Sequence, residues 1–331
     1  MNRTLFLLGQ ADTESRGEST SVAVEGGSIV TKTLVGVVPI LPYIMSDRTL
    51  AAHSASILID ASTTRPPANS RVNLFNLVGD ADSSTKSLHT IQNIINAVQP
   101  KRCFNKPIDV FKTSRARLPK TLADIPRCIV PRVEAANPGT YGELQEACKN
   151  FNSWPIIVRA AGFHGGEYMN LLTDIADLDA IKDQQWLYGG IVLIEFIDYI
   201  NERGQYQKNR VIMVDGVPYP RHAVTSNHWM VHAQTRAELM NEDLELCHRE
   251  KTFLATGLQE YGQVFREIYQ RIGLDIFGID FAIVDAQIVI FEANACMKFL
   301  DRSFRADNRF DYLDGHVKAI KSAIKKMLLR S

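Results

Sequence analysis

The residues with the clearest potential for chemistry lie near the C-terminal end, in the segment 278–294. Asp280 begins one apolar run in this segment, and Glu292 and Asn294 end the next one. The pattern predicts two β-strands joined by a tight turn. If the turn comprises the three residues 285–287, Asp280 lies opposite Glu292, and the two carboxylates share one face of the hairpin with Asn294. Three such oxygen ligands at one end of a sheet suit a hard divalent cation such as Mg²⁺.

The length of this turn decides the metal hypothesis, because side chains alternate between the two faces of a strand. A two-residue turn would shift the pairing by one residue and place Asp280 and Glu292 on opposite faces. The metal site therefore requires the three-residue turn. The alternative interpretation is a surface hairpin with polar ends.

A glycine-rich stretch after a short apolar run is the second candidate. The run 154–158 predicts a buried strand, and Arg159 stands at its end, followed by Gly162, Gly165 and Gly166. Backbone N–H groups beside glycine can approach anionic oxygens closely, so a cation and such a loop can cradle phosphate groups. No Gly-Lys-Ser/Thr sequence follows, which excludes a Walker loop. The alternative is an ordinary flexible turn.

Two arginines are expected to face each other on another hairpin. Asp215-Gly216 is a strong signal for a two-residue turn, and this turn pairs Arg210 with Arg221. Like charges directly opposite each other on one face of a sheet are unfavourable unless an anion lies between them. The pair therefore suggests a site for phosphate or carboxylate. Otherwise both long side chains extend into solvent.

Three histidines cluster in the segment 222–232. His222, His228 and His232 have neither a partnering cysteine nor HExxH spacing, so a zinc site is disfavoured. Contacts with a substrate or a phosphate, or plain packing, remain as interpretations of this cluster.

An apolar strand is expected at 190–198, and it contains the sequence Glu195-Phe196-Ile197-Asp198. The backbone of such a strand can meet the edge of an adenine ring, with the carboxylate of Glu195 or Asp198 beside the sugar. The alternative is a strand that simply reaches solvent.

The composition narrows the class of protein. The 331 residues are enough for two or three domains with buried cores. Lysine plus arginine and aspartate plus glutamate both number 37, so we expect no nucleic-acid footprint. The apolar run 34–45 is too short to span a bilayer, and the run 4–8 is too short for the core of a signal peptide. Five cysteines without CxxC spacing predict free thiols in a reducing cytoplasm.

The elements that must position these residues follow from the periodicity of apolar side chains. In the first part of the chain, strands at 55–59 and 72–78 precede a helix whose apolar stripe runs from Ile91 to Val98. This alternation of strand and helix predicts an open α/β domain over residues 1–110.

A small central domain is expected over residues 111–189. In it, Thr140 and Glu143 form a capping box for a helix that ends at Phe151. The buried strand and the glycine-rich loop follow this helix.

A C-terminal domain is expected over residues 190–331, and it contains both hairpins. A long helix is predicted over 246–271, and Gly273 stands where the left-handed cap of such a helix belongs. A final amphipathic helix has an apolar side that runs from Val317 to Leu328.

In this order, the features resemble the ATP-grasp superfamily. Within it they are most similar to the branch with glutathione synthetase and the glutamate ligases that extend a ribosomal-protein tail, and less to D-alanine–D-alanine ligase. The resemblance covers roughly residues 100–300. Its most specific part is the spacing of the metal residues, because Glu292 follows Asp280 by twelve residues and Asn294 follows Glu292 by two.

The resemblance implies nucleotide-binding residues. The segment Glu195–Ile197 corresponds to the adenine hinge of the family. Arg159 stands where the family usually has a lysine, ahead of the glycine-rich loop. The earlier lysine of the family corresponds to Lys112, Arg115 or Arg117, of which we favour Arg115.

The resemblance also implies catalytic residues. Arg210 corresponds to the arginine that opens the hairpin, and it would hold phosphate and acylphosphate together with Arg221. Asn227, in the pair Ser226-Asn227, corresponds to an asparagine near the phosphates. The family's Asn-x-x-Pro-Gly sequence is replaced by Cys-Met-Lys at 296–298. Because that part of the family often touches the acceptor, the resemblance does not extend to the substrate.

The fold implied is α/β with ATP-grasp architecture, in which an open α/β pre-ATP-grasp domain precedes a small central domain and a C-terminal antiparallel sheet domain. ATP would bind between the last two. The activity implied is that of an ATP-dependent carboxylate–amine ligase that forms an amide bond through an acylphosphate and releases ADP and phosphate. The cofactors implied are ATP and two Mg²⁺ ions, with Mn²⁺ as a substitute. The alternatives are a nucleotide-binding regulatory module without turnover and an ATP-grasp kinase.

Under this interpretation the partners are a carboxylate and an amine, each a small molecule or a peptide. No nucleic acid and no membrane are expected as partners. A cytoplasmic location is expected, and a homodimer is the assembly considered.

Overall fold

The computed structural model describes residues 4–9, 21–25, 28–32, 40–59, 72–163, 166, 168–232, 236, 239–240, 243–299 and 308–330. Within these residues the chain forms two four-stranded sheets, one five-stranded sheet and one two-stranded sheet. The two-stranded sheet pairs β2 (Ser21–Glu25) with β3 (Ser28–Lys32).

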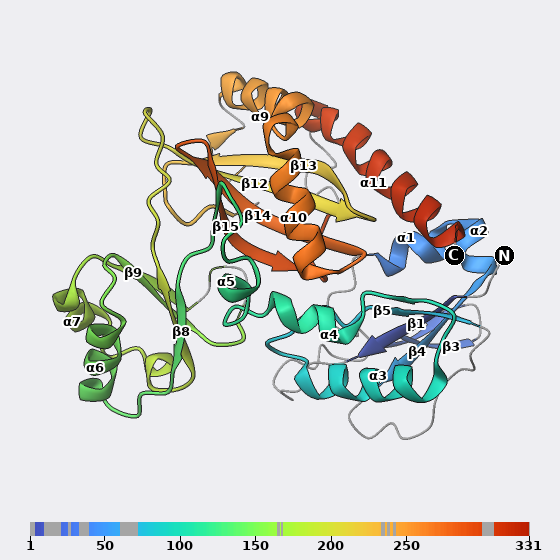
Figure 1. Cartoon of the computed structure of the whole chain (residues 1–331), viewed down its shortest axis with the longest axis horizontal. Helices are drawn as coiled ribbons and strands as arrows, with labels where there is room; N and C mark the ends of the chain where they lie inside the picture. The colour runs from blue at the N-terminus through green and yellow to red at the C-terminus, as the bar shows by residue number, and fades with distance from the viewer. Residues whose placement is uncertain are drawn as a thin grey trace.

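The N-terminal sheet is parallel and has the strand order β4-β1-β5-β6. Its strands are β1 (Thr4–Gly9), β4 (Ser54–Ile59), β5 (Asn73–Asn76) and β6 (Cys103–Phe104). Two short helices, α1 (Leu41–Ser46) and α2 (Arg48–Ala52), precede β4. Helix α3 (Thr85–Val98) buries Ile91, Ile94 and Val98 in one core with Leu7 and Leu74. The predicted open α/β arrangement is confirmed in this part of the chain (Figure 1).

The central sheet is antiparallel and has the order β10-β9-β11-β8. Its strands are β8 (Val133–Ala136), β9 (Ile156–Ala160), β10 (Met169–Leu172) and β11 (Ile191–Glu195). Its helical elements are α6 (Tyr141–Phe151), η3 (Ile175–Asp177), α7 (Leu178–Ile181) and η4 (Gln185–Tyr188). Helix α6 begins as expected, because the hydroxyl of Thr140 accepts a hydrogen bond from the backbone N–H of Glu143 at 3.3 Å.

The third sheet has the order β13-β12-β14-β15-β7. Its strands are β7 (Cys128–Ile129), β12 (Tyr206–Val214), β13 (Val217–Ser226), β14 (Ile276–Val284) and β15 (Gln287–Asn294). The elements α4 (Pro107–Val110), η2 (Phe111–Thr113) and α5 (Leu118–Thr121) lead from the N-terminal sheet to β7. The sheets do not follow the expected boundary at residue 190, because β11 pairs with β8 and β9, and β7 pairs with β15.

The long helix predicted over 246–271 is in fact two helices. They are α9 (Leu244–Thr256) and α10 (Gly262–Ile272), with η5 (Gln259–Tyr261) between them. The chain turns at Gly257, where a Cβ atom would collide with the ring of Phe253. Gly273 caps α10 in the left-handed conformation, as predicted, and donates its N–H to Tyr269 O at 2.8 Å.

The final helix, α11 (Tyr312–Leu329), follows η6 (Asn308–Phe310) and buries the apolar side predicted for it. Its residues Ile320 and Ile324 share a core with Phe6 and Phe75 of the N-terminal sheet. The central sheet has a core of its own, which includes Phe151 and Val158. The N-terminal and C-terminal parts are therefore packed together, whereas the central part is packed separately, as its position at the left of Figure 1 shows.

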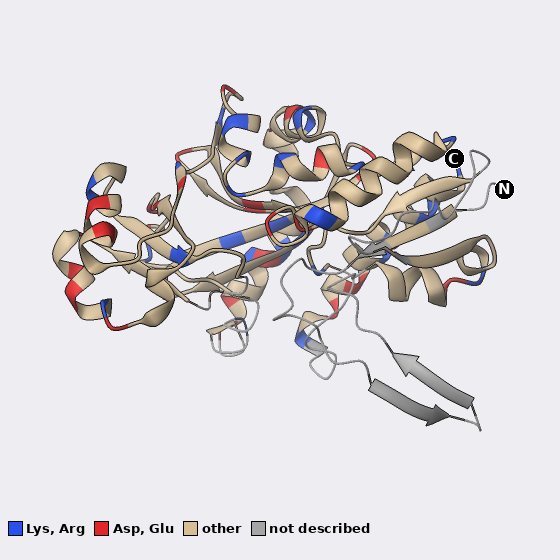
Figure 2. Ribbon diagram, turned by 90° about the horizontal axis from the view of Figure 1, so that it is seen from below, with Lys and Arg blue, Asp and Glu red and all other residues tan. Residues whose placement is uncertain are grey.

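Charged residues of both signs are interspersed along the described ribbon (Figure 2), in agreement with the equal numbers of acidic and basic residues. Of the helices formed by the described residues, none is long and apolar enough to cross a membrane.

A buried ion pair connects the elements behind the third sheet. Both oxygens of Glu250 on α9 accept hydrogen bonds from Arg236, one of them at 2.6 Å. Glu250 also accepts from the backbone N–H of Ala223 at 2.8 Å and from the hydroxyl of Tyr312 at 2.5 Å. The side chains of the pair are 2% and 0% exposed, so removal of either partner leaves a charge buried without compensation.

We expect Glu250→Leu to lower the free energy of unfolding by about 3–5 kcal/mol, because Arg236 would then be buried unpaired. The double variant Arg236→Met/Glu250→Leu should recover most of this loss. Urea denaturation measures both effects. The control is Glu245→Gln on the same helix, whose carboxylate pairs with Arg203 in solvent and should matter little. Equal stability of the Glu250 and Glu245 variants would contradict the prediction.

Candidate functional site

The hairpin of β14 and β15 differs from the predicted one in its turn. Val284 pairs with Gln287, so the turn has two residues, Asp285 and Ala286, and the prediction of a three-residue turn was wrong. Both turn residues have positive φ, at 47° and 60°, as in type I′ hairpin turns. Alanine is an unusual residue for this conformation, and for this reason the sequence did not indicate the short turn.

Asp280 nevertheless lies opposite Glu292, as expected. The pairing shifts by one residue between Asp280 and Phe281, because Phe281 pairs with Ile290. The extra residue, Phe291, forms a β-bulge in β15. The bulge compensates for the short turn and returns Asp280 and Glu292 to the same face.

The other hairpin contains a second bulge. Its turn is Asp215-Gly216, as predicted, but Arg210 pairs with His222, and Val211 pairs with Pro220. Arg221 is the extra residue, so the predicted pairing of Arg210 with Arg221 was wrong. A bulge is easily accommodated here, because β13 is an edge strand and Pro220 has no N–H to donate.

The two bulges create a row of side chains across four strands. His222 lies opposite Arg210, Arg210 opposite Asp280, and Asp280 opposite Glu292. Residues directly opposite each other in an antiparallel sheet share a face. Burial, and then the charge of Arg210, lower the pKa of His222 well below its usual value, so the imidazole is neutral beside this arginine.

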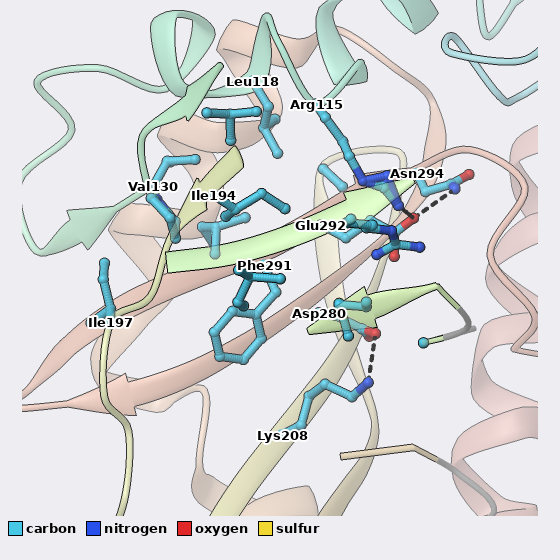
Figure 3. A pocket seen from close by; sticks show the side chains of 18 of the residues that line it. Arg115, Leu118, Val130, Ile194, Ile197, Lys208, Asp280, Phe291, Glu292 and Asn294 are labelled. Atoms are coloured by element: carbon cyan, nitrogen blue, oxygen red, sulfur yellow. Dashed lines mark hydrogen bonds and ion pairs between the residues drawn. The ribbon is translucent and has the colours of Figure 1, made fainter. Parts of the chain in front are cut away.

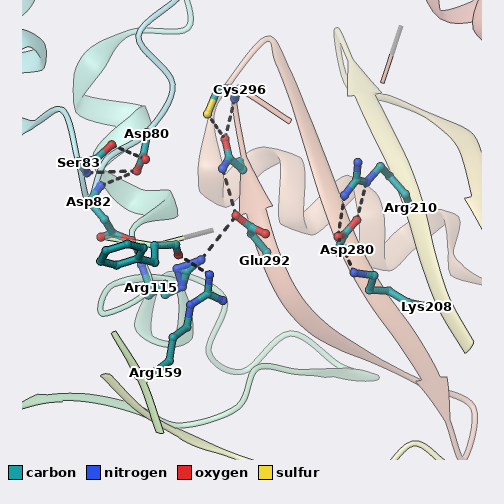
Figure 4. Close-up of polar contacts among 12 residues, drawn as sticks. Asp80, Asp82, Ser83, Arg115, Arg159, Lys208, Arg210, Asp280, Glu292 and Cys296 are labelled. Carbon is teal, nitrogen blue, oxygen red and sulfur yellow. Dashed lines mark hydrogen bonds and ion pairs between the residues drawn. The ribbon is translucent and has the colours of Figure 1, made fainter. Parts of the chain in front are cut away.

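Asp280 is the most constrained member of the row. Its two carboxylate oxygens accept hydrogen bonds from Arg210 Nε at 2.6 Å and Nη2 at 2.8 Å, and Lys208 Nζ lies 3.6 Å away (Figure 4). Burial alone would raise the pKa of Asp280, but the charges of Arg210 and Lys208 outweigh it and lower the pKa. The carboxylate is therefore ionised, although it is only 5% exposed.

Glu292 and Asn294 contact each other and residues of other segments. A guanidinium nitrogen of Arg115 lies 3.9 Å from Glu292, whose side chain is 31% exposed. Asn294 donates from Nδ2 to Glu292 Oε1 at 3.1 Å, and its Oδ1 accepts from the backbone N–H of Cys296 at 2.6 Å. The same Oδ1 atom also accepts a hydrogen bond from Cys296 Sγ at 2.8 Å.

A pocket of about 260 Å³ lies over the row. Figure 3 shows charged side chains at one end, around Arg115, Glu292 and Asp280, and apolar side chains at the other, around Phe291 and Ile197. The predicted site residues that line the pocket are Arg115, Arg159, Gly166, Glu195, Phe196, Ile197, Arg210, Asp280, Glu292 and Asn294.

Other predicted residues do not line the pocket. Arg221 is buried and donates from Nε to the carbonyl of Phe299 at 2.7 Å. Asp198 accepts a hydrogen bond from the N–H of Ile200 at 3.0 Å, which forms a local turn. The remaining predicted residues outside the lining are Gly162 and Asn227, while Gly165 lies outside the described residues.

Of the three basic residues considered for one position, Arg115 is the one that lines the pocket. Lys112 instead contacts Asp109 at 2.7 Å, and the guanidinium of Arg117 lies over the ring of Phe111 at 5.6 Å. The structure thus brings Arg115, and neither of the others, to Glu292.

Comparison with known proteins was made for both sequence and structure. No protein-family model matches the chain, and no curated protein matches it. The structure is similar to that of a RimK domain ATP-grasp protein from Sphaerobacter thermophilus, with 13% identity, a TM-score of 0.53, and coverage of 98% of this chain and 99% of the other. It is also similar to the structure of D-alanyl-alanine synthetase A from Vibrio cholerae, with 12% identity, a TM-score of 0.56, and coverage of 100% of this chain and 99% of the other. The chain has the ATP-grasp fold.

A third solved structure agrees with this fold. D-alanine–D-alanine ligase from Bacillus anthracis, complexed with ATP, has 12% identity, a TM-score of 0.52, and coverage of 100% of this chain and 98% of the other. The similarity extends over nearly the whole length of each chain. The predicted ATP-grasp fold is therefore confirmed, while the roles of individual residues depend on the geometry of the pocket.

Some residues that line the pocket were missed by the sequence analysis. Lys208 lines the pocket beside Asp280, and its position two residues before Arg210 on the same strand could have indicated this. Gly79 and Asp80 also line the pocket, from the N-terminal part of the chain. A Cβ atom at Gly79 would lie 2.6 Å from Cys296 N. This close approach of distant segments has no local signal in the sequence.

His232 was recognised as a histidine of interest, and the structure gives it a specific contact. The glycine-rich loop of the ATP-grasp fold reaches it through Gly166, where a Cβ atom would collide with the imidazole and lie 2.9 Å from Met230 Sδ. Burial, followed by the charges of Lys208 and Arg159, lowers the pKa of His232. The loop therefore docks on a neutral imidazole from the segment that follows β13.

We expect Gly166→Ala to displace the glycine-rich loop from His232. Gly162→Ala is the matched control, because both glycines have positive φ but a Cβ atom at Gly162 has no atom within 4 Å. Both variants pay the cost of a left-handed alanine, about 1–2 kcal/mol. Only Gly166→Ala should also speed hydrogen exchange of amides in the segment 159–169, measured by mass spectrometry. Equal exchange in the two variants would rule out the docking contact.

Proposed function

We propose that the chain is an ATP-dependent carboxylate–amine ligase. The observation that carries this proposal is the pocket, which combines an apolar end beside Phe196 and Ile197 with a charged end that contains Arg115, Arg159 and Glu292. The fold supports the proposal, since solved structures of similar fold include proteins named D-alanyl-alanine synthetase A and D-alanine–D-alanine ligase. The proposed products are ADP, phosphate and an amide.

The end of β11 offers backbone groups to an adenine ring. Phe196 donates its N–H to Pro155 O at 3.0 Å, on the side of β9. The carbonyl of Glu195 and the N–H of Ile197 point to the opposite edge, because alternate residues of a strand face the same side. The N–H of Arg132 on that edge donates to the carboxylate of Glu195 at 3.0 Å, so the carbonyl of Glu195 is left for a ligand.

The hydrogen bond from the N–H of Arg132 also gives the Glu195 side chain a role other than the predicted one beside the sugar. The same carboxylate accepts from Ser153 Oγ at 3.4 Å. Glu195 thus joins the two segments that connect the central sheet to the third sheet, and we assign the recognition of adenine to its backbone. Phe291 and Ile197 provide apolar contacts for the ring.

The cations of the pocket suit a triphosphate. Arg115, Arg159 and Lys208 come from three different segments of the chain and line one pocket, next to Gly166 of the glycine-rich loop. Arginine and lysine bind phosphate oxygens through charge-assisted hydrogen bonds. When the central sheet closes on the third sheet, these groups would surround the transferred phosphoryl group and keep water from it.

The residues present also fit a magnesium ion. Glu292 and Asn294 offer a carboxylate and an amide oxygen from one face of β15, and both line the pocket. Asp280, the third predicted ligand, accepts a hydrogen bond from Arg210 at each oxygen, and each oxygen keeps a second lone pair. When bound, Mg²⁺ would neutralise charge on the phosphate oxygens.

In the proposed reaction, the substrate carboxylate attacks the γ-phosphorus of ATP, and the bond to ADP breaks. An amine then attacks the acylphosphate carbon, loses a proton, and displaces phosphate. Arg210, which lines the pocket, stays in the proposal as the residue that holds Asp280 and faces the acylphosphate. Arg221 and Asn227 do not line the pocket and are left out of it.

The hinge predicts discrimination between nucleobases. Adenine presents its amino group to the carbonyl of Glu195 and its N1 to the N–H of Ile197, whereas guanine reverses the donor and the acceptor at this edge. Two mismatched hydrogen bonds should weaken Mg·GTP relative to Mg·ATP by about 100-fold. Isothermal titration with non-hydrolysable analogues measures this ratio. Similar affinities would show that adenine is not read at this edge.

The ligase proposal predicts ADP release that depends on a carboxylate substrate. A screen of amino acids, dipeptides and longer peptides with Mg·ATP should find an acid and an amine that together give ADP, phosphate and an amide, detected by mass spectrometry. Glu292→Ala should lower turnover by at least about 100-fold, because it removes a metal ligand. Glu260→Ala is the control, since Glu260 is exposed and lies outside the pocket.

The alternatives give different results in the same screen. A regulatory module would bind ATP and gain thermal stability, but no carboxylate would trigger ADP release. A kinase would release ADP without an amine and leave a stable phosphorylated product. Either result would refute the ligase proposal.

A further inference from the structure

The bulge residue Phe291 is not held by the hydrogen-bond ladder of its sheet. It is the extra residue of β15, so no residue of β14 lies opposite it, and the pairing of β15 with β7 ends at Val289. The extra residue of a bulge is left out of the ladder. The position of Phe291 therefore depends on the packing of its side chain rather than on β14 or β7.

The bulge also brings two consecutive side chains to the pocket. In a regular strand, Phe291 and Glu292 would face opposite sides of the sheet. Here both line the pocket, with Phe291 at its apolar end and Glu292 at its charged end (Figure 3). Because the two residues share a peptide bond, a shift of Phe291 changes the direction in which Glu292 points.

Tyr199 supports the ring of Phe291. The two ring centroids are 4.9 Å apart. Tyr199 is only 8% exposed, lines the same pocket, and comes two residues after Ile197. Its ring lies edge-on to that of Tyr206 at 5.0 Å, and its hydroxyl donates a hydrogen bond to the carbonyl of Trp229. These contacts fix Tyr199, and Tyr199 in turn limits the movement of the Phe291 ring.

A bound nucleobase would restrict this ring further. In the proposed function, adenine lies between the backbone of the segment 195–197 and apolar side chains that include Phe291. Aromatic rings attract each other in offset-stacked or edge-to-face contacts. A base in such a contact would hold the Phe291 ring between itself and Tyr199. Restriction of the ring also restricts the backbone of the bulge, and Glu292 is the next residue along this backbone.

We propose that Tyr199 is a positioning residue that couples recognition of the nucleobase to the placement of Glu292, through the bulge at Phe291. The base then does more than add affinity, because its contact with Phe291 orders the carboxylate at the charged end of the pocket. This inference rests on the proposed function, in which the pocket binds a nucleotide and Glu292 contributes to that binding.

A double-mutant cycle measures this coupling. Isothermal titration gives the affinity for Mg·adenylyl imidodiphosphate of the wild type, Glu292→Gln, Tyr199→Leu and the double variant. If Tyr199 orders Glu292, the change Glu292→Gln costs much affinity in the wild type and little once Tyr199 is replaced. The double variant should then bind at least about fivefold more tightly than the product of the two single effects predicts. Two effects that simply multiply would overturn the proposal.

Two further variants separate positioning from general damage to the pocket. Tyr199→Phe keeps the ring that contacts Phe291. Trp229→Leu removes another aromatic side chain of the pocket, whose ring lies 5.9 Å from that of Phe196 and, within the described residues, has no ring contact with Phe291. In both backgrounds Glu292→Gln should weaken binding by the same factor as in the wild type. Loss of the Glu292 effect in the Trp229→Leu background would refute a specific role of Tyr199.

A comparison of two ligands needs no substitution at Tyr199, so it decides the question if Tyr199→Leu does not fold. Tripolyphosphate carries the phosphate chain without a base or a sugar. Glu292→Gln should weaken the binding of Mg·adenylyl imidodiphosphate by a factor at least about fivefold larger than for Mg·tripolyphosphate, because only the nucleotide orders the bulge. Equal factors for the two ligands would overturn the proposal.

These results can be separated from a failure of the proposed function. If Mg·adenylyl imidodiphosphate does not bind to the wild type, the nucleotide site is refuted, and this inference with it. If the nucleotide binds and Glu292→Gln weakens it equally with and without Tyr199, the nucleotide site stands, and only the coupling through Phe291 is wrong.

Discussion

The ion pair between Arg210 and Asp280 is the contact on which the organisation of the site depends. A carboxylate that is almost fully buried needs a charged partner, and here the partner is the residue directly opposite on the neighbouring strand. The strands on either side of this pair, β13 and β15, must then place their own polar residues directly opposite Arg210 and Asp280. Each does so by a bulge, one at Arg221 and one at Phe291. The irregularities of the sheet are therefore the means by which four strands place their side chains in one row.

The three larger sheets contribute different parts of the pocket. The third sheet supplies the charged row, the central sheet supplies Arg159 and Glu195, and the N-terminal part supplies Asp80. The carboxylate of Glu195 and the N–H of Arg132 join the two segments between the central and third sheets. Rotation of the central sheet about this point would change the width of the pocket and leave the charged row intact.

Much of this organisation could be predicted from the sequence. The Asp215-Gly216 turn and the Gly273 cap could be predicted because they are local features. In each, the type of residue at the position is enough to favour the observed backbone conformation. The registers of the two hairpins were harder to predict, because the position of a bulge depends on contacts with a neighbouring strand. A pattern of alternation cannot show that Phe291 is an extra residue. The correct pairing of Asp280 with Glu292 was in fact predicted from the wrong turn. Lys208 was missed for another reason, because its importance arises only from its distance to Asp280.

The separation of the hydrophobic cores affects which substitutions can accumulate during evolution. Among the described residues, the core around Phe151 shares no residue with the other two, so substitutions there can be compensated within the central part alone. Phe6, near the beginning of the chain, and Ile324, near its end, share one core and can compensate for each other. Related sequences should therefore show covariation between their first and last elements, while the central part varies independently of both.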